Sequence, residues 1–265
     1  MKREVPEAPK SAWLLVVGAF VVVAVLLPLV IRTPAPASST SAATVTSTAT
    51  GSSAPATATN GTAATSTSSA PSSTQALVLS VLGDAYTAGS GATSPETGFG
   101  QLTGQELGWT VTTFGEPGTG YTNPGTGGAV YLDRVQSVID SKPDVVVVQG
   151  STNDDAATEA QIQSAAAEVF SRLRAGLPDA RLFALGALDT PDSVAAVVAV
   201  ARSAVRSAAT AGSAVTFVDP TGWLDPNDGT LFSDGFRASQ AGHQRIADRL
   251  SAVLTASVTA ATASP

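Results

Sequence analysis

The stretch Leu79-Ser80-Val81-Leu82-Gly83-Asp84-Ala85-Tyr86-Thr87-Ala88-Gly89 decides the fold of this chain. It contains the end of a largely apolar run, residues 76–82, which is followed by Gly-Asp-Ala and a turn that closes at Gly89. In open α/β sheets, a buried parallel strand delivers its carboxyl end to the crevice where ligands bind. We therefore predict a first strand over residues 76–82 and a binding site directly after it.

Three later segments repeat this arrangement of an apolar element followed by polar or Gly-rich residues. The Gly-dense loop 114–121 follows a predicted strand at 109–113. Residues 149–154 (Gln-Gly-Ser-Thr-Asn-Asp) follow the β-branched run 145–148, which is typical of a strand buried on both faces. The last segment, residues 232–243, precedes the apolar stripe of a final helix. The sequence thus predicts one crevice that is lined by four separate segments.

These four segments, in this order, resemble the conserved blocks of the SGNH (GDSL) hydrolases. The first block of that family is Gly-Asp-Ser-x-x-x-Gly, and its Ser is the nucleophile; here the position is Ala85. The resemblance implies that Gly118, with Gly120 as the alternative, donates a backbone N–H to an oxyanion. It also implies that Asn153, in the third block, donates its side-chain amide. Thr113 stands where the family often has an Asn that braces the Gly loop.

The last segment resembles the family's Asp-x-x-His-Pro block. Asp234 matches the acid that orients the catalytic His, but Arg237 stands at the position of that His. His243 matches a later, non-catalytic His at the start of the final helix, where we expect a structural role. Acyl transfer needs a hydroxyl that attacks and an imidazole that accepts its proton. Ala85 has no hydroxyl and Arg237 stays protonated, so the conventional Ser–His reaction is not available.

Asp234 and Arg237 leave two interpretations open. They form a local ion pair at the rim of the pocket, or Arg237 joins the N–H groups of Ala85 and Gly118 and the amide of Asn153 in a cradle for an anion or an acyl oxygen. The planar fork of donors on Arg suits carboxylate recognition.

The resemblance and the order of elements predict a three-layer α/β domain, SGNH/flavodoxin-like, with about five parallel strands over residues 76–258. Further strands are expected at 181–185 and 214–218. Helices are expected at 99–107, 129–141, 159–177, from Pro191 to about Thr210, and at the end of the domain.

A transmembrane anchor is predicted at residues 12–31, an uncharged apolar run long enough to span a bilayer core as a helix. Lys2, Arg3 and Lys10 precede it, so the positive-inside rule places the tail 1–11 in the cytoplasm and the rest outside. A secretory signal peptide cleaved near Ala37 is the alternative, although its apolar core would be shorter.

Residues 32–75 are rich in Ser, Thr, Ala and Pro and cannot bury enough apolar surface to fold. We expect a disordered stalk, either O-glycosylated or an unmodified spacer. A short disordered tail is expected at 259–265.

The composition excludes several classes of function. The chain has a net charge of −7 and no basic stripe, which argues against a nucleic-acid partner. It has no Cys and one His, so we expect no disulfide, no metal site and no cofactor.

Three functional hypotheses remain. The first is an anchored extracytoplasmic pseudoenzyme that binds an acyl, glycan or carboxylate ligand, or a protein partner. The second is an esterase of the cell envelope with a non-standard nucleophile. The third is a structural protein of the bacterial envelope with a relict pocket.

Overall fold

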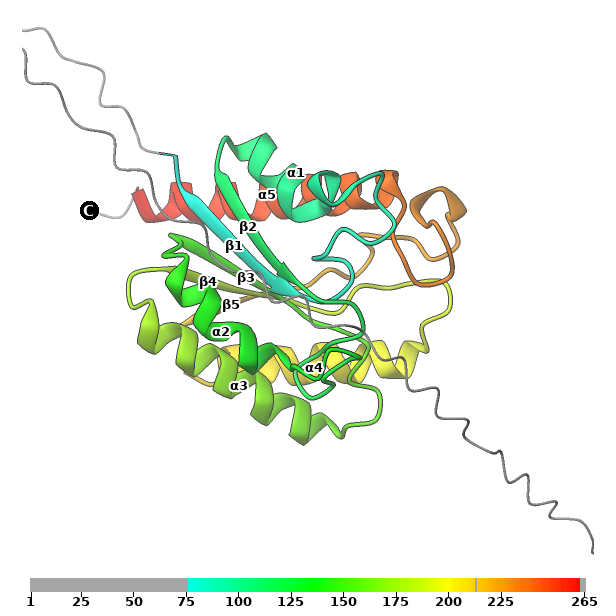
Figure 1. The fold of residues 1–265 in the computed structure, drawn as a ribbon, viewed down its shortest axis with the longest axis horizontal. Helices are drawn as coiled ribbons and strands as arrows, with labels where there is room; N and C mark the ends of the chain where they lie inside the picture. Colours follow the sequence, from blue (N-terminus) through cyan, green and yellow to red (C-terminus); the bar gives the residue numbers. More distant parts are fainter. Residues whose placement is uncertain (1–75, 213, 263–265) are drawn as a thin grey trace, which may run out of the picture. The chain divides into compact units, whose positions relative to one another are not determined.

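The computed structural model describes residues 76–212 and 214–262. Within them, one parallel sheet has the strand order β2-β1-β3-β4-β5, with helices on both faces (Figure 1). The strands are β1 Val78–Gly83, β2 Thr110–Gly115, β3 Val145–Gln149, β4 Arg181–Leu185 and β5 Val215–Val218. The α-helices are α1 Phe99–Leu107, α2 Tyr131–Asp140, α3 Glu159–Gly176, α4 Ala195–Thr210 and α5 Gln240–Thr262, and the 3-10 helices are η1 Pro95–Thr97 and η2 Gly229–Leu231.

Two hydrophobic cores lie on the two faces of the sheet, because successive residues of a strand point to opposite sides. On β3, Val146 and Val148 pack with α2, α3 and α4, whereas Val145 and Val147 pack with α1 and α5. All five residues of β3 are buried, as predicted for a central strand. Figure 1 shows the same three layers. The predicted three-layer domain with five parallel strands is therefore confirmed.

Helix α1 lies close to the sheet because two of its residues have no side chain. A Cβ on Gly100 would lie 2.9 Å from Cγ2 of Thr113, and a Cβ on Gly104 would overlap Cγ2 of Val111. The two glycines weaken the helical pattern in the sequence, yet the helix spans the predicted residues 99–107. Close packing on β1 and β2 thus offsets their low helix propensity.

The prediction that a helix opens at Pro191 is wrong. Helix α4 begins at Ala195, and the residues before it form a turn instead. The Ser193 hydroxyl accepts a hydrogen bond from Thr190 N (3.1 Å) and donates one to Thr190 O (2.9 Å). The N–H of Asp192 donates to the Gly235 carbonyl (3.0 Å), which holds this turn against a distant loop. This tertiary contact outweighs the tendency of Pro to start a helix.

Several other boundaries differ from expectation, among them the ends of β2 and α5. Strand β2 extends to Gly115, because it pairs with β1 through to Gly83. Helix α5 continues to Thr262, four residues beyond the expected domain end at 258. The Thr259 hydroxyl donates to Thr255 O (2.9 Å), and the Ala-rich end of the helix favours its continuation.

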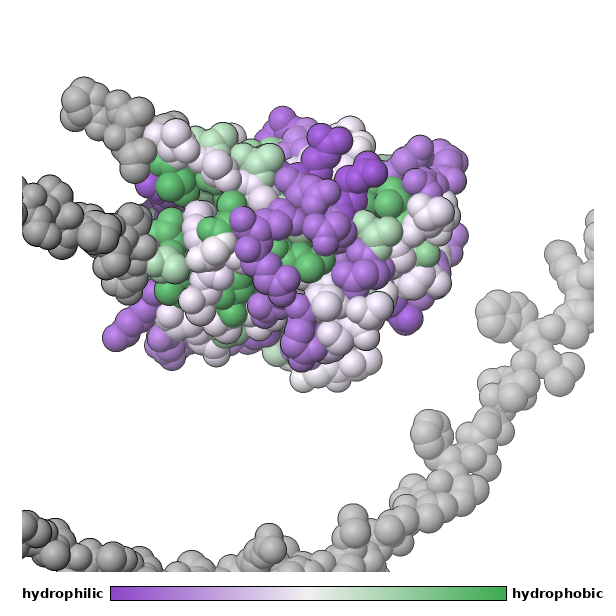
Figure 2. Space-filling view, turned by 90° about the horizontal axis from the view of Figure 1, so that it is seen from above, coloured by the Kyte–Doolittle hydropathy of each residue, from purple (hydrophilic) through white to green (hydrophobic). Residues whose placement is uncertain are grey.

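The predicted tail 1–11, the anchor 12–31 and the stalk 32–75 lie outside the described residues. Among the helices of residues 76–212 and 214–262, none is both long and apolar enough to cross a bilayer. On the face seen in Figure 2, small hydrophobic patches alternate with hydrophilic side chains. The large apolar side chains of α1 and α5, among them Phe99, Ile246 and Leu250, are buried against the sheet instead.

Candidate functional site

A cavity of about 220 Å³ opens at the carboxyl ends of the strands. Strand β1 lies between β2 and β3 in the sheet. After β1 the chain first forms β2 at one edge, and it then forms β3, β4 and β5 on the other side of β1. Crevices in open α/β sheets form at such a switch point. The cavity wall comprises Asp84, Ala85, Tyr86, Pro117, Gly118, Gln149, Gly150, Thr152, Asn153, Leu188, Thr190, Phe236 and Arg237. The structure thus brings together the four segments that the sequence predicted to meet.

Ala85 lies in the turn that follows β1. Its carbonyl accepts from Ser90 N (2.9 Å), and the Asp84 carbonyl accepts from Ala88 N (3.0 Å). The N–H of Ala85 has no acceptor within the described part of the chain. The turn therefore places Ala85, with a methyl side chain and an N–H that has no acceptor among the described residues, in the cavity wall.

Asp84 ties the turn to the end of β3. Its Oδ1 accepts from Tyr86 N (3.0 Å) and Gln149 Nε2 (2.8 Å), and its Oδ2 accepts from Ser151 Oγ (2.7 Å). Burial raises the pKa of this carboxyl, although these hydrogen bonds oppose the shift. Asp84 thus has a structural role, because its bond to the Tyr86 N–H holds the turn. The Ser151 hydroxyl is thus one of the donors that hold this carboxyl in place.

Gly118 lies in the loop after β2 and has a φ of 78°, a left-handed conformation that favours glycine. Gly118 is exposed and lines the cavity, and its N–H has no acceptor among the described residues. Gly120 is buried, does not line the cavity, and donates its N–H to Asn123 O (2.8 Å). A Cβ on Gly120 would lie 2.6 Å from Cγ of Asp154. Of the two glycines, Gly118 is the one whose N–H is free at the cavity.

Asn153 lines the cavity, but its amide is already engaged. Its Nδ2 donates to the Thr119 carbonyl (2.9 Å) and lies 3.4 Å from Oδ2 of Asp84. Both neighbours are acceptors, which fixes the nitrogen of the amide toward them. In this structure the amide connects the Gly118 loop to β1, and donation to a ligand would compete with these contacts.

Asp154 holds the Gly118 loop from the other side. Its carboxylate accepts from the backbone N–H groups of Tyr121 (3.0 Å), Thr122 (2.7 Å) and Asn123 (3.0 Å), and from the Thr122 hydroxyl (2.7 Å). Asp154 is 2% exposed. The loop is thus fixed by a carboxylate that follows β3.

Arg134 on α2 is a site residue that sequence reasoning missed. Its Nη1 donates to the carbonyls of Gly83 (2.9 Å) and Phe114 (2.6 Å), and its Nη2 donates to the Thr119 hydroxyl (2.7 Å). Its guanidinium also lies 5.1 Å from the ring centroid of Tyr131. Burial lowers the pKa of Arg134, against the opposing effects of Tyr131 and nearby carboxylates. This single side chain joins the ends of β1 and β2 to the Gly118 loop.

We expect Arg134→Gln to lower the free energy of unfolding by about 2–3 kcal/mol, because three oxygens lose a charged donor. The measurement is urea denaturation monitored by circular dichroism. Arg172→Gln is the matched control: Arg172 makes one exposed i,i+4 ion pair and should cost less than about 0.5 kcal/mol. Equal losses in both variants would contradict the bracing role of Arg134.

Asp234 and Arg237 form the ion pair that the first interpretation described. Nη1 of Arg237 lies 3.0 Å from Oδ2 of Asp234. Oδ1 of Asp234 accepts from the backbone N–H of Phe236 (2.9 Å) and of Arg237 (2.7 Å), and these bonds lower the pKa of Asp234. Arg237 lines the cavity, whereas Asp234 reaches it only through Arg237.

His243 is buried away from the cavity. Its Nδ1 accepts from Phe99 N (3.1 Å), so the proton resides on Nε2, which lies 3.1 Å from the Ser90 carbonyl and donates to it. Burial lowers the pKa of His243. This imidazole ties α5 to α1 and to the loop that carries Ala85.

The lowered pKa of His243 predicts a loss of stability in mild acid. Below pH 6.5 the unfolded chain takes up a proton that the folded chain resists, so the free energy of unfolding falls as pH falls toward the folded pKa. The slope approaches about 1.4 kcal/mol per pH unit. Chemical denaturation at pH 7.5, 6.5 and 5.5 measures it.

The control for this prediction is His243→Gln, which removes the titrating group. The raised pKa of Asp84 contributes a slope of opposite sign in both proteins, so the difference between them isolates His243. An unchanged slope in His243→Gln would contradict the assignment.

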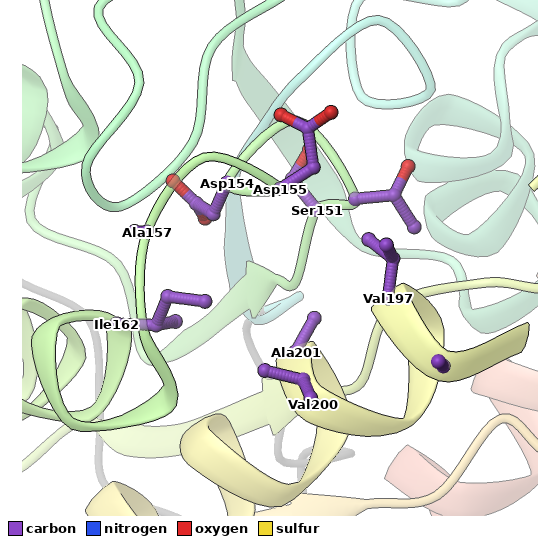
Figure 3. A pocket seen from close by; sticks show the side chains of 10 residues that line it. Ser151, Asp154, Asp155, Ala157, Ile162, Val197, Val200 and Ala201 are labelled. Carbon is purple, nitrogen blue, oxygen red and sulfur yellow. The ribbon is translucent and has the colours of Figure 1, made fainter. Parts of the chain in front are cut away.

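A second, more apolar pocket of about 190 Å³ adjoins the cavity at Thr152, which lines both. Figure 3 shows Ile162 of α3 facing Val197, Val200 and Ala201 of α4, with the loop 151–157 beside them. The arrangement offers an aliphatic lining next to a cavity with free N–H donors. Within residues 76–212 and 214–262, no cluster of three His, Cys, Asp or Glu side chains could hold a metal ion.

Solved structures of two esterases and of a G-D-S-L family protein have a similar fold. A family two carbohydrate esterase from Clostridium thermocellum, in complex with cellohexaose, is 22% identical with a TM-score of 0.59; the match covers 70% of this chain and 66% of that one. A third of that esterase thus has no counterpart here. A G-D-S-L family protein from Desulfitobacterium hafniense DCB-2 is 16% identical, with a TM-score of 0.55 and coverage of 67% and 99%. Esterase EstA from Pseudoalteromonas sp. is 14% identical, with a TM-score of 0.56 and coverage of 69% and 99%.

Sequence comparison identifies the family. No curated protein sequence matches the chain significantly. Residues 81–245, which include all four segments of the cavity wall, match the family described as GDSL-like Lipase/Acylhydrolase. Together with the parallel sheet and the cavity at its switch point, this match leads to one conclusion: the chain belongs to the GDSL-like lipase/acylhydrolase family, the SGNH hydrolases.

Proposed function

We propose that this protein is a pseudoenzyme of the SGNH hydrolase family, which binds an acyl, carboxylate or glycan ligand in its cavity without hydrolysing it. The observation that carries the proposal is the chemistry of the cavity wall. It has free N–H donors at Ala85 and Gly118 and a cation at Arg237. The imidazole of His243, the one His of the chain, is bonded elsewhere.

The free donors favour a ligand with an acceptor oxygen. The N–H groups of Ala85 and Gly118 suit a carbonyl or carboxylate, and Arg237 adds a positive charge that a ligand would share with Asp234. The adjoining apolar pocket suits a short aliphatic group on the same ligand. The carbohydrate esterase with cellohexaose supports a glycan as a further ligand class. An open cavity lined by Gly118 and Asn153 favours binding over a purely structural role.

The test is an assay of the full-length protein, purified in mild detergent, with p-nitrophenyl acetate. We expect hydrolysis at the rate of buffer alone, with no change in the Asn153→Ala variant. Turnover above buffer that Asn153→Ala abolishes would overturn the pseudoenzyme and favour an esterase with a non-standard nucleophile.

Ligand binding is tested separately by NMR titration with acetate. Acetate should bind weakly, and Arg237→Gln should lower its affinity, whereas Arg172→Gln on the exposed side of α3 should not. A folded protein that does not bind acetate would contradict the carboxylate part of the proposal.

We further propose that residues 12–31 anchor the protein in a membrane, with the domain outside the cytoplasm. The length of the apolar run and the preceding positive charges support this orientation. Protease added to intact cells should digest the domain. Protection of the domain until the cells are lysed would contradict the proposed orientation.

A further inference from the structure

Thr190 carries a hydroxyl group that the fold does not use. The residue is 6% exposed and lies in the cavity wall, in the turn between β4 and α4. Its N–H and carbonyl bond to Ser193, but its Oγ1 has no hydrogen-bond partner in the described part of the chain. A buried hydroxyl without a partner destabilises a protein, and Val has the same shape without that penalty. In this structure Oγ1 itself is buried, and a change of χ1 to another staggered position is what would bring the hydroxyl toward the cavity.

Two other polar side chains of the cavity wall are engaged within the protein. Gln149 accepts from Thr87 Oγ1 (2.8 Å) and donates to Asp84, and Arg237 pairs with Asp234. Thr190 differs from Gln149 and Arg237 because its buried Oγ1 has no hydrogen-bond partner among the described residues. An unpaired buried hydroxyl in a cavity wall points to a polar partner on a ligand.

Phe236 presents an aromatic ring at the same cavity. It is 59% exposed, which makes it one of three large hydrophobic side chains exposed in the described residues. Its backbone is fixed, because its N–H donates to Asp234 Oδ1 (2.9 Å) and its carbonyl accepts from the Tyr86 hydroxyl (2.9 Å). The backbone of Phe236 is thus fixed in the cavity wall, and its side chain is exposed there.

The turn of Thr190 and the loop of Phe236 are joined directly. Asp192 N donates to Gly235 O (3.0 Å), so the two residues belong to one connected wall. This wall combines a hydroxyl that can donate and accept with an aromatic face that attracts C–H groups. A pyranose ring suits both of these groups, because its hydroxyls at the edge can bond to the Thr hydroxyl and the C–H groups on its face can pack on the aromatic ring.

We propose that Thr190 and Phe236 form a second part of the binding site, which takes a hydroxylated ring that carries the carbonyl or carboxylate group held at Ala85 and Gly118. This inference rests on the proposed function and names its ligand class as a sugar that bears a carboxylate or an acyl group. None of the four family blocks supplies Thr190.

NMR titrations of the full-length protein with three carboxylate ligands separate the contributions of the carboxylate group, the ring and the hydroxyls to binding. Acetate has only the carboxylate, cyclohexanecarboxylate adds a ring, and glucuronate adds a ring with hydroxyls. We expect affinity to rise in that order. Thr190→Val should weaken glucuronate binding about tenfold and leave the other two ligands unchanged. Phe236→Ala should weaken both ring ligands about fivefold.

Two controls separate binding from folding. Thr190→Ser keeps the hydroxyl and should keep glucuronate affinity, and Val194→Ala changes an exposed residue of the same turn that does not line the cavity. The Tm of Thr190→Val should equal or exceed that of the parent, because an unpaired buried hydroxyl is lost. A lowered Tm with equal losses for all three ligands would show a structural role and overturn the proposal.

The remaining outcomes are also decisive. If acetate binds but glucuronate binds no tighter, the second part of the site is refuted and the proposed function survives. If none of the three ligands binds to the folded parent, both proposals fail for carboxylates.

Discussion

The double variant Ala85→Ser/Arg237→His is expected to hydrolyse p-nitrophenyl acetate at least about a thousandfold faster than the parent. Loss of a nucleophile and base that act as a unit costs about 10⁶ in turnover in subtilisin, so a partial recovery still gives a large effect. The measurement is kcat/KM of the full-length protein, with Tm recorded to show that each variant is folded.

The geometry of the parent supports this gain. Asp234 already pairs with the side chain of residue 237, with 3.0 Å between Oδ2 and Nη1 of Arg237, so its carboxylate is the expected acceptor for the Nδ1–H of an introduced imidazole once this shorter side chain has turned toward it. The free N–H groups of Ala85 and Gly118 lie at the cavity to bind a developing oxyanion. The double variant thus restores the two missing groups in a wall that otherwise remains.

The single variants are the matched controls. Ala85→Ser alone lacks a base and Arg237→His alone lacks a nucleophile, so each should stay near the rate of the parent. If a folded double variant stays silent, the wall no longer supports acyl transfer, and the reading of these two positions as lost catalytic residues is wrong. Equal activity in one single variant would contradict the assignment of the other residue.

Asp154→Ala is expected to lower the free energy of unfolding by roughly 3–5 kcal/mol. The substitution leaves the N–H groups of Tyr121, Thr122 and Asn123 without their acceptor, and the loop that carries Gly118 loses its main attachment. Denaturant unfolding measures the loss, and acetate titration should show weaker binding.

The neighbouring residue provides a close control. Asp155 has the same chemistry, but it is exposed and accepts no hydrogen bond from the described residues. Asp155→Ala should change stability by less than about 0.5 kcal/mol. A small effect in Asp154→Ala, close to that of Asp155→Ala, would mean that the loop is held by other contacts.

The local sequence was sufficient to predict the strands that carry the site. The β-branched run 145–148 predicts a central strand from four residues, and the structure buries it on both faces. Helix α1 and strand β4 have the predicted bounds. Pro191 misled the prediction, because the contact of Asp192 with Gly235 joins segments far apart in the chain.

The residues of the site likewise divide into those that the sequence placed at the crevice and one that only the structure revealed. Ala85, Gly118, Asn153 and Arg237 follow strands or precede the last helix, so their order along the chain and a family resemblance placed them at one crevice. Arg134 had no such signal, because an Arg on an amphipathic helix normally faces solvent. Its role depends on Gly83, Phe114 and Thr119, which only the folded chain brings to it.

The sequence by itself determined the sheet, the crevice at its switch point and the absence of a hydroxyl and an imidazole at residues 85 and 237, because these follow from local hydrophobic pattern and residue identity. The tertiary structure decided which polar groups are free at that crevice. It engages the amide of Asn153 with Thr119, buries His243 against Phe99, and leaves the hydroxyl of Thr190 without a partner among residues 76–212 and 214–262. Hydrogen bonding between distant segments is a property of the packed chain, and no local pattern encodes it.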